Sequence, residues 1–289
     1  MPDLVDDPAH HCSAVRGRTD LIARVATGIC DGLALGERVA CAGLGPVEHL
    51  MAELADVVGP SASRRLAMAH RDGRLVMLDD AAPSAAPPVP WDHLGSVAAL
   101  AMATRTHGYA GLRVVRDATP LMTGRRSDRQ RSVCFEHLLD RYCLLHPLTV
   151  SCCYDIDAVG ADAVGEAAAV HRHADRGLTA FRLSFTSGSD LALFGSVDAF
   201  TCVSFSETLE RIDLTPGRFL TLDLGHVDYI DHAALLALDE HGTRRGIVFE
   251  LRRAPYAAER LARALELRHV RVPHPLSAPD RRAPWVDVL

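Results

Sequence analysis

The sequence predicts an α/β protein made of two parts. Short apolar runs alternate with longer segments whose apolar residues recur at helical spacing, which predicts a mostly parallel sheet with helices on both faces. After residue 178, two apolar runs joined by a polar turn predict a hairpin, so we expect a second, mixed sheet with helices. A length of 289 residues suits two ordinary domains.

The composition is typical of a folded, soluble chain. Hydrophobic residues make up 48% and charged residues 24%, and no apolar run approaches the roughly 18 residues of a membrane span. The acidic, polar start has no apolar stretch of a secretory signal, so we expect a cytoplasmic protein without a membrane partner. The net charge of −6 argues against nucleic acid as a partner.

The chain contains no lysine and no asparagine, so its 31 basic residues are all arginine. This absence excludes the lysine of a phosphate-binding P-loop, a Schiff-base lysine for a pyridoxal cofactor, and the catalytic loop of a protein kinase. The Gly-x-Ser-x-Gly turn of a serine hydrolase is absent as well. We therefore expect no catalytic residues, no cofactor and no enzymatic activity.

The first part is expected to span residues 11–173, after a flexible N-terminus over residues 1–10. Its elements in order are strand 11–15, helix 21–35, strand 38–42, helix 47–58, strand 74–78, helix 91–106, strand 112–115, helix 127–145, strand 148–152 and helix 161–173. Thr19 and Asp20 offer an N-cap to the first helix, and Gly36 ends it. Residues 81–90 are rich in Pro and Ala and can continue neither a helix nor a strand, so they predict an exposed loop.

Polar residues follow three of the predicted strands of the first part. In parallel sheets, ligands bind beyond the carboxyl ends of the strands. We therefore expect a ligand pocket at that edge, although a strand end followed by a turn would use the same residue types. The residues concerned are Gly43, Gly45, Arg116, Asp117, Cys153, Tyr154 and Asp155.

The second part is expected to span residues 178–270, after a polar linker over residues 174–177 and before a C-terminal tail over residues 271–289. Its elements in order are strand 181–185, strand 191–194, helix 200–211, strand 219–224, helix 233–241, strand 247–251 and helix 255–267. Asp231 is predicted to cap the helix that follows it.

The segment LDLGHVDYIDHAAL at residues 222–235 resembles the STAS domain, which sulphate transporters share with bacterial anti-sigma-factor antagonists. The pair Gly195 and Asp198 resembles the first-hairpin motif of that family. This resemblance implies a protein-binding surface, contacted by an anti-sigma factor or a switch kinase. The residues implied are Asp231, His232, Ala233, Ala234, Leu235, Gly195 and Asp198.

The resemblance to STAS domains lacks one feature of their regulatory members. There, a serine directly after the aspartate is phosphorylated, and the added charge of about −2 changes the docking surface. This chain has His232 at that position and no hydroxyl at 233 or 234. Serine phosphorylation at this helix start is therefore excluded. His232 is expected to be a surface residue of the first helical turn, and phosphoryl transfer to its imidazole is the alternative.

The first part resembles the sensory domain abbreviated MEDS, first described in a regulator of dichloromethane degradation. The residues that carry this resemblance are GLRV at 111–114 with Asp117, CYD at 153–155 and GER at 36–38. The resemblance implies a truncated nucleotide-binding-type α/β fold in a signalling protein that senses small ligands.

Histidines and cysteines are frequent, but their spacing is not typical of a metal site. The eight cysteines include no C-x-x-C pair, and neither His10-His11 nor His171-x-His173 has helical spacing or a neighbouring cysteine pair. The sequence therefore predicts neither a metal site nor a disulfide scaffold.

Together these features predict a non-enzymatic bacterial regulator, in which a sensory part is coupled to a part that binds a regulatory protein. The alternative is a small-molecule receptor whose second part serves only as a scaffold or a homodimer interface. The sequence names neither the ligand nor the partner.

Overall fold

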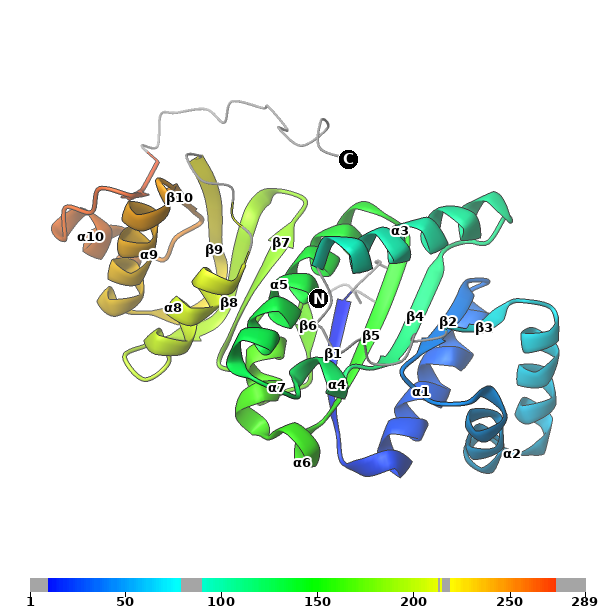
Figure 1. The fold of residues 1–289 in the computed structure, drawn as a ribbon. Coiled ribbons are helices and arrows are strands. Elements are labelled where there is room, and N and C mark those ends of the chain that lie inside the picture. The colour runs from blue at the N-terminus through cyan, green and yellow to red at the C-terminus, as the bar shows by residue number, and fades with distance from the viewer. Residues whose placement is uncertain (1–9, 79–89, 213, 215–218, 274–289) are drawn as a thin grey trace.

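The computed structural model describes residues 10–78, 90–212, 214 and 219–273, which form two sheets with helices packed on them (Figure 1). The first sheet has six parallel strands, and the second has five strands in a mixed arrangement. The predicted fold class is therefore confirmed for both parts of the chain.

All strand pairs of the first sheet are parallel. In chain order the strands are β1 His10–Val15, β2 Arg38–Ala42, β3 Leu75–Met77, β4 Leu112–Asp117, β5 Leu148–Asp155 and β6 His173–Ala174, and their order across the sheet is β3-β2-β4-β5-β1-β6. The N-terminal strand β1 lies inside the sheet, with His10 opposite Val150 of β5.

Helices cover both faces of the first sheet. They are α1 Gly17–Ala34, α2 Val47–Arg71, α3 Pro90–Thr106, α4 Thr119–Met122, α5 Arg126–Leu145, α6 Ile156–Val159 and α7 Ala161–Ala168. Apolar residues of α1 and α2 form a core against one face, together with Val39 and Cys153. Residues of α3, α5 and α7 pack on the other face, around Leu112 and Val150.

The second sheet starts with an antiparallel hairpin and continues with parallel pairs. Its strands are β7 Phe181–Thr186, β8 Ser189–Val197, β9 Phe219–Ile230, β10 Val248–Arg252 and β11 Val270–Arg271, in the order β11-β10-β9-β8-β7, and its helices are α8 Cys202–Arg211, α9 His232–Arg245 and α10 Tyr256–Ala264. Alternate residues of β10, Phe249 and Leu251, are buried beneath these helices, while its other residues are half-buried.

The predicted N-cap of α9 is present, whereas the predicted N-cap of the first helix is not. Asp231 caps α9, since its Oδ1 accepts a hydrogen bond from Ala234 N at 3.1 Å, and Gly246 ends the helix in the left-handed conformation. The first helix starts earlier than predicted, at Gly17. Asp20 then lies in its first turn and accepts a hydrogen bond from Arg16 N at 3.0 Å.

Other predicted boundaries differ from the structure. Residue His10, expected in the flexible N-terminus, is the first residue of β1 and is fully buried, whereas residues 1–9 lie outside the described residues. The helix expected over 161–173 ends at Ala168, because the following residues turn back into β6. Ala174, expected in the linker, is part of that strand.

Two further differences concern α2 and the C-terminus. The chain breaks helical geometry at Gly59, which has a φ of 75°, and resumes as a helix to Arg71, so α2 extends past its predicted end. Arg271, expected in the tail, lies in β11, while residues 274–289 lie outside the described residues. Of the expected loop 81–90, only Pro90 is described, as the first residue of α3.

The two sheets share one continuous apolar core. It runs from Leu112 and Tyr142 of the first part to Leu183 and Phe249 of the second. Backbone and charge contacts accompany it, since Leu183 N donates to Ala169 O at 2.7 Å and Arg211 lies 3.3 Å from Glu166. Among the described helices, none combines the length and apolar character that crossing a bilayer requires.

Candidate functional site

The residues predicted to form one pocket in the first sheet are divided between its two faces. Cys153 is buried in the core beneath α1 and α2, whereas Tyr154 is buried on the opposite face, beside α5. The reason is the pleat of β5, since consecutive residues of a strand point to opposite faces. The predicted pocket therefore does not form as a single site.

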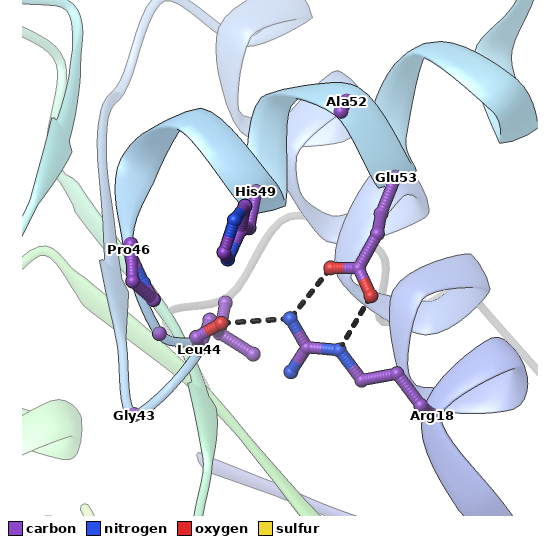
Figure 2. Close-up of a pocket in the computed structure, with 8 residues that line it drawn as sticks. Arg18, Gly43, Leu44, Pro46, His49, Ala52 and Glu53 are labelled. Atoms are coloured by element: carbon purple, nitrogen blue, oxygen red, sulfur yellow. Dashed lines mark hydrogen bonds and ion pairs between the residues drawn. The ribbon is translucent and has the colours of Figure 1, made fainter.

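Gly43 and Gly45 line an open hollow of about 590 Å³ at the end of β2 (Figure 2). Its lining includes Arg18 and Glu53. The guanidinium of Arg18 donates to both carboxylate oxygens of Glu53 at 2.9 and 2.6 Å and to Leu44 O at 2.7 Å. The pKa of Glu53 is lowered, because its carboxylate is bonded to Arg18. Because Glu53 neutralises the charge of Arg18, the hollow has no free positive charge at this position to attract an anionic ligand.

The remaining predicted edge residues stabilise turns. Asp117 accepts a hydrogen bond from Thr119 N at 2.9 Å, and Asp155 caps α6 by accepting one from Asp157 N at 3.0 Å. The guanidinium of Arg116 lies 5.6 Å from the centre of the Phe135 ring. These contacts account for the polar residues at the ends of β4 and β5 without a ligand.

A second group of polar side chains meets inside the first part, and we call it the buried cluster. It comprises His10 of β1, Glu136 of α5, Cys152 of β5 and His171, which follows α7. All four residues are fully buried, and one nitrogen, oxygen or sulfur atom from each lies within 4.8 Å of the others.

The centre of the buried cluster is Glu136 Oε2. It lies 3.0 Å from His10 Nε2, 3.5 Å from Cys152 Sγ and 3.6 Å from His171 Nε2. Cys152 Sγ lies 3.4 Å from His10 Nε2, and the two imidazole rings stack with their centres 3.8 Å apart. The polar atoms of three side chains, each from a different chain segment, therefore surround the carboxylate oxygen of Glu136.

The charges of the buried cluster are strongly coupled. Burial opposes ionisation of Glu136, but its contact with His10 and the charge of Arg116 outweigh that effect, so the pKa of Glu136 is lowered. Burial would lower the pKa of His10, yet Asp140 and Glu136 raise it. Burial and the charge of His10 lower the pKa of His171 to about 3, so His171 is neutral near pH 7.

Groups around the buried cluster hold it in position. Tyr154 OH donates to the second oxygen of Glu136, Oε1, at 3.1 Å. His171 Nδ1 lies 2.8 Å from Ala167 O, so this nitrogen carries the proton and donates. Burial raises the pKa of the Cys152 thiol well above its usual range, and the nearby Glu136 adds to the rise.

The buried cluster is connected to the second sheet through Asp140. His10 Nδ1 lies 3.7 Å from Asp140 Oδ1. The same carboxylate accepts hydrogen bonds from Arg172 N at 3.0 Å and from Phe185 N of β7 at 3.3 Å. A change at His10 would therefore reach the backbone of the second sheet through a single side chain.

Of the residues in and around the buried cluster, only Tyr154 is among the ligand residues that the sequence predicts. His10 and His171 stood out as histidines, but they lie 161 positions apart and gave no spacing that links them. A signal was nevertheless available in Glu136, a charged residue on a predicted helix whose neighbours Val133 and Leu139 are apolar. A charge in that position is buried only when it is paired.

In the second part, the predicted partner-binding residues have different environments. His232 is exposed and Ala233 is half-buried, but Ala234 and Leu235 are fully buried in the core and offer no surface to a partner. They face inward because they lie on the apolar side of α9. Ala234 and Leu235 therefore cannot belong to the predicted partner-binding surface.

The other two predicted residues of that surface have clear local roles. Gly195 has a φ of 80°, and a Cβ built there would lie 2.3 Å from Ala180 O, so only glycine fits. Asp198 Oδ1 accepts hydrogen bonds from Phe200 N and Thr201 N at 3.0 Å each, which orders the turn before α8. Hydrogen bonding to Thr201 lowers the pKa of Asp198.

Comparison with known proteins identifies the first part of the chain. No curated protein matches the chain. The family model described as MEDS, the methanogen/methylotroph, DcmR sensory domain, matches residues 9–172, which is more than half of the 289 residues. The resemblance predicted from the motifs at 36–38, 111–114 and 153–155 is confirmed by this match. The chain therefore belongs to the MEDS family of sensory domains.

Proposed function

We propose that the protein is a non-enzymatic signalling regulator, in which residues 11–173 sense a ligand and residues 178–270 bind a regulatory protein. Membership of a family of sensory domains supports a role in signalling. The proposed partner is an anti-sigma factor or a switch kinase. This part of the proposal rests on the likeness of residues 222–235 to STAS domains.

The observation that carries the partner-binding role is an exposed apolar surface at one end of the second sheet. Phe200 is 92% exposed, Val203 67% and Tyr229 57%. Backbone contacts join the segments that present them, because Asp231 N donates to Val197 O at 3.1 Å and Ser196 lies opposite Tyr229 in the sheet. Exposed apolar side chains on segments that meet at one end of a sheet favour protein binding.

The strand arrangement supports the same proposal. An antiparallel hairpin is followed by strands that pair in parallel through intervening helices, with Asp231 capping α9 where the STAS motif has its aspartate. Positions 232 to 234, directly after Asp231, carry no phosphorylatable hydroxyl, so we propose that the signal enters through the first part. The Asp140 contacts and the pairing of Arg211 with Glu166 offer routes for it to the second.

A binding experiment with full-length protein tests this function. Purified chain is used as bait for anti-sigma factors and switch kinases encoded beside it, and affinities are measured for Phe200→Asp and Tyr229→Asp. We expect each charge to weaken binding at least about tenfold, which corresponds to about 1.4 kcal/mol. The control is Met102→Asp on α3, where the native side chain is 69% exposed and lies in the first part.

Two results would contradict the proposal. One is a failure of the wild-type chain to bind any of the regulators encoded beside it. The other is a loss of binding in Met102→Asp equal to that in Phe200→Asp, because the effect would then not depend on the end of the second sheet.

The open hollow at Gly43 and Gly45 favours a second candidate function, a small-molecule receptor whose second part is only a scaffold or a dimer interface. A thermal-shift screen with small organic ligands distinguishes it. A ligand at 100 times its dissociation constant stabilises the fold by about 2.7 kcal/mol. Such a shift in a chain that binds no regulatory protein would favour the receptor.

A further inference from the structure

We propose that the buried cluster, formed by His10, Glu136, Cys152 and His171, binds one divalent transition metal ion of the zinc type. This inference deepens the sensory role proposed above, because it names the chemistry of a ligand for the first part. It departs from the sequence analysis, which predicted no metal site.

The donor atoms have the identity that a tetrahedral zinc-type ion requires, and four of their six separations lie near the spacing of such a site. Zinc is bound by imidazole nitrogen, thiolate sulfur and carboxylate oxygen, with bonds of about 2.0–2.3 Å, so neighbouring ligand atoms of a tetrahedron lie about 3.3–3.8 Å apart. The separations from Glu136 Oε2 are 3.0, 3.5 and 3.6 Å, Cys152 Sγ lies 3.4 Å from His10 Nε2, and all four atoms lie within 4.8 Å of one another. Small outward movements of the side chains would admit an ion.

His171 provides an independent indication that a ligand belongs here. Its Nδ1 donates to Ala167 O, so Nε2 carries the lone pair. That Nε2 is completely buried, faces Glu136 Oε2, and has no hydrogen-bond partner among the described residues. A buried acceptor without a partner is costly, and a metal ion would satisfy it. Metal-binding histidines typically have this tautomer, with the far nitrogen bonded to a carbonyl.

The outer contacts of the other ligands fit the same interpretation. Tyr154 OH donates to Glu136 Oε1 at 3.1 Å, which leaves Oε2 facing the cluster. Asp140 lies 3.7 Å from the outer nitrogen of His10, and this order of carboxylate, histidine and ion is frequent around zinc.

Charge balance favours a soft divalent ion over calcium or magnesium. The Cys152 thiolate and the Glu136 carboxylate carry two negative charges, which one divalent ion neutralises. Binding displaces the thiol proton of Cys152 and also the Nε2 proton by which His10 pairs with Glu136, since the pKa of His10 is raised. Both protons are released to the solvent, and the two imidazoles bind in their neutral form. Calcium and magnesium prefer all-oxygen sites, whereas thiolate and imidazole select zinc-type ions.

The burial of all four ligands determines how such an ion would act. An ion would connect β1, α5, β5 and the chain after α7, and it would exchange only when these segments separate. His10 lies beside Asp140, whose other oxygen is bonded to β7. Occupancy would therefore stabilise the contact between the first part and the second sheet.

Metal binding can be measured without any protein partner. Full-length chain is stripped with a chelator and dialysed against zinc, and bound metal is counted by elemental analysis. Cobalt replaces zinc as a spectroscopic probe. We expect one ion per chain, intense visible absorption from tetrahedral cobalt, and a thiolate-to-cobalt charge-transfer band. Stripped wild-type chain that binds no zinc and shows no cobalt band would overturn the proposal.

Two cysteine variants test the thiolate ligand. Cys152→Ser should lose the charge-transfer band and bind metal at least about tenfold more weakly. The control, Cys41→Ser, replaces another buried thiol of the same sheet, on the face toward α1 and α2, and should keep both properties. Retention of the band in Cys152→Ser, or its loss in Cys41→Ser, would contradict the assignment.

Tyr154→Phe covers the case in which Cys152→Ser does not fold. This variant removes only the hydroxyl that holds Glu136, so it should keep the cobalt band and bind zinc about 10–100-fold more weakly. An unchanged zinc affinity would refute the proposed role of Glu136. Because no regulatory protein takes part in these measurements, a negative result would leave the proposed partner binding untouched.

Discussion

Asp140 of α5 is bonded to the backbone on both sides of the boundary between the two sheets, and its replacement is expected to weaken their junction. One oxygen accepts a hydrogen bond from Arg172 N at 3.0 Å, and the other accepts one from Phe185 N of β7 at 3.3 Å. Asp140 itself is 3% exposed, so water does not readily take its place.

The expected loss of stability can be worked out from these two bonds. Asp140→Ala leaves both N–H groups without an acceptor, and a buried unsatisfied donor costs about 1–3 kcal/mol. Both donors belong to half-buried residues, so the lower half of that range applies and the free energy of unfolding should fall by about 2–4 kcal/mol. Asp140→Asn keeps one acceptor oxygen and should lose about half as much.

Urea unfolding of the full-length variants, followed by circular dichroism, measures these losses. The control is Glu240→Ala on α9, which removes an exposed ion pair with Arg244 and should change stability by less than about 0.5 kcal/mol. A loss below about 1 kcal/mol in Asp140→Ala would refute the argument that this carboxylate holds the junction.

Four further results are expected. Phe205 is fully buried against Phe181 in the second core, so Phe205→Ala should lower the free energy of urea unfolding by about 3–5 kcal/mol, and a loss under about 1 would contradict that packing. Asp231→Ala removes the N-cap of α9 and should cost about 1 kcal/mol in thermal unfolding, whereas Asp231→Ser should be nearly neutral. Gly195→Ala forces a side chain against a carbonyl at positive φ and should destabilise the chain by more than about 1 kcal/mol, measured by the urea midpoint. Burial lowers the pKa of His241 despite its contact with Glu210, so the unfolded chain takes up a proton first as the pH falls below about 6.5. Stability should then decline between about pH 7 and pH 5 less steeply in His241→Gln than in wild type, and equal slopes would exclude this histidine as a cause.

Local sequence signals predicted most of the elements because their causes are local. The strand over 38–42 and the cap at Asp231 depend on residues a few positions apart, and both are present in the structure. The helix end near 168 was missed because it depends on a distant contact. After the helix ends, His173 and Ala174 pair with β1, which lies far away in the sequence.

The predicted ligand residues Cys153 and Tyr154 illustrate a different limit. The rule that ligands bind at strand ends selected these two consecutive residues of β5, but the pleat sends them to opposite faces of the sheet. Of the two, only Tyr154 lies on the face covered by α5, where its hydroxyl donates to Glu136.

The sequence by itself determined the α/β class, the order of the longer strands and helices and the likeness of the first part to MEDS domains, because periodicity and motifs depend on neighbouring residues. Only the tertiary structure decided that His10, Glu136, Cys152 and His171 meet. They come from four segments, and the parallel register of β1 with β5 and the packing of α5 on the sheet bring them together. Such proximity depends on how whole elements pack, so spacing along the chain could not reveal it.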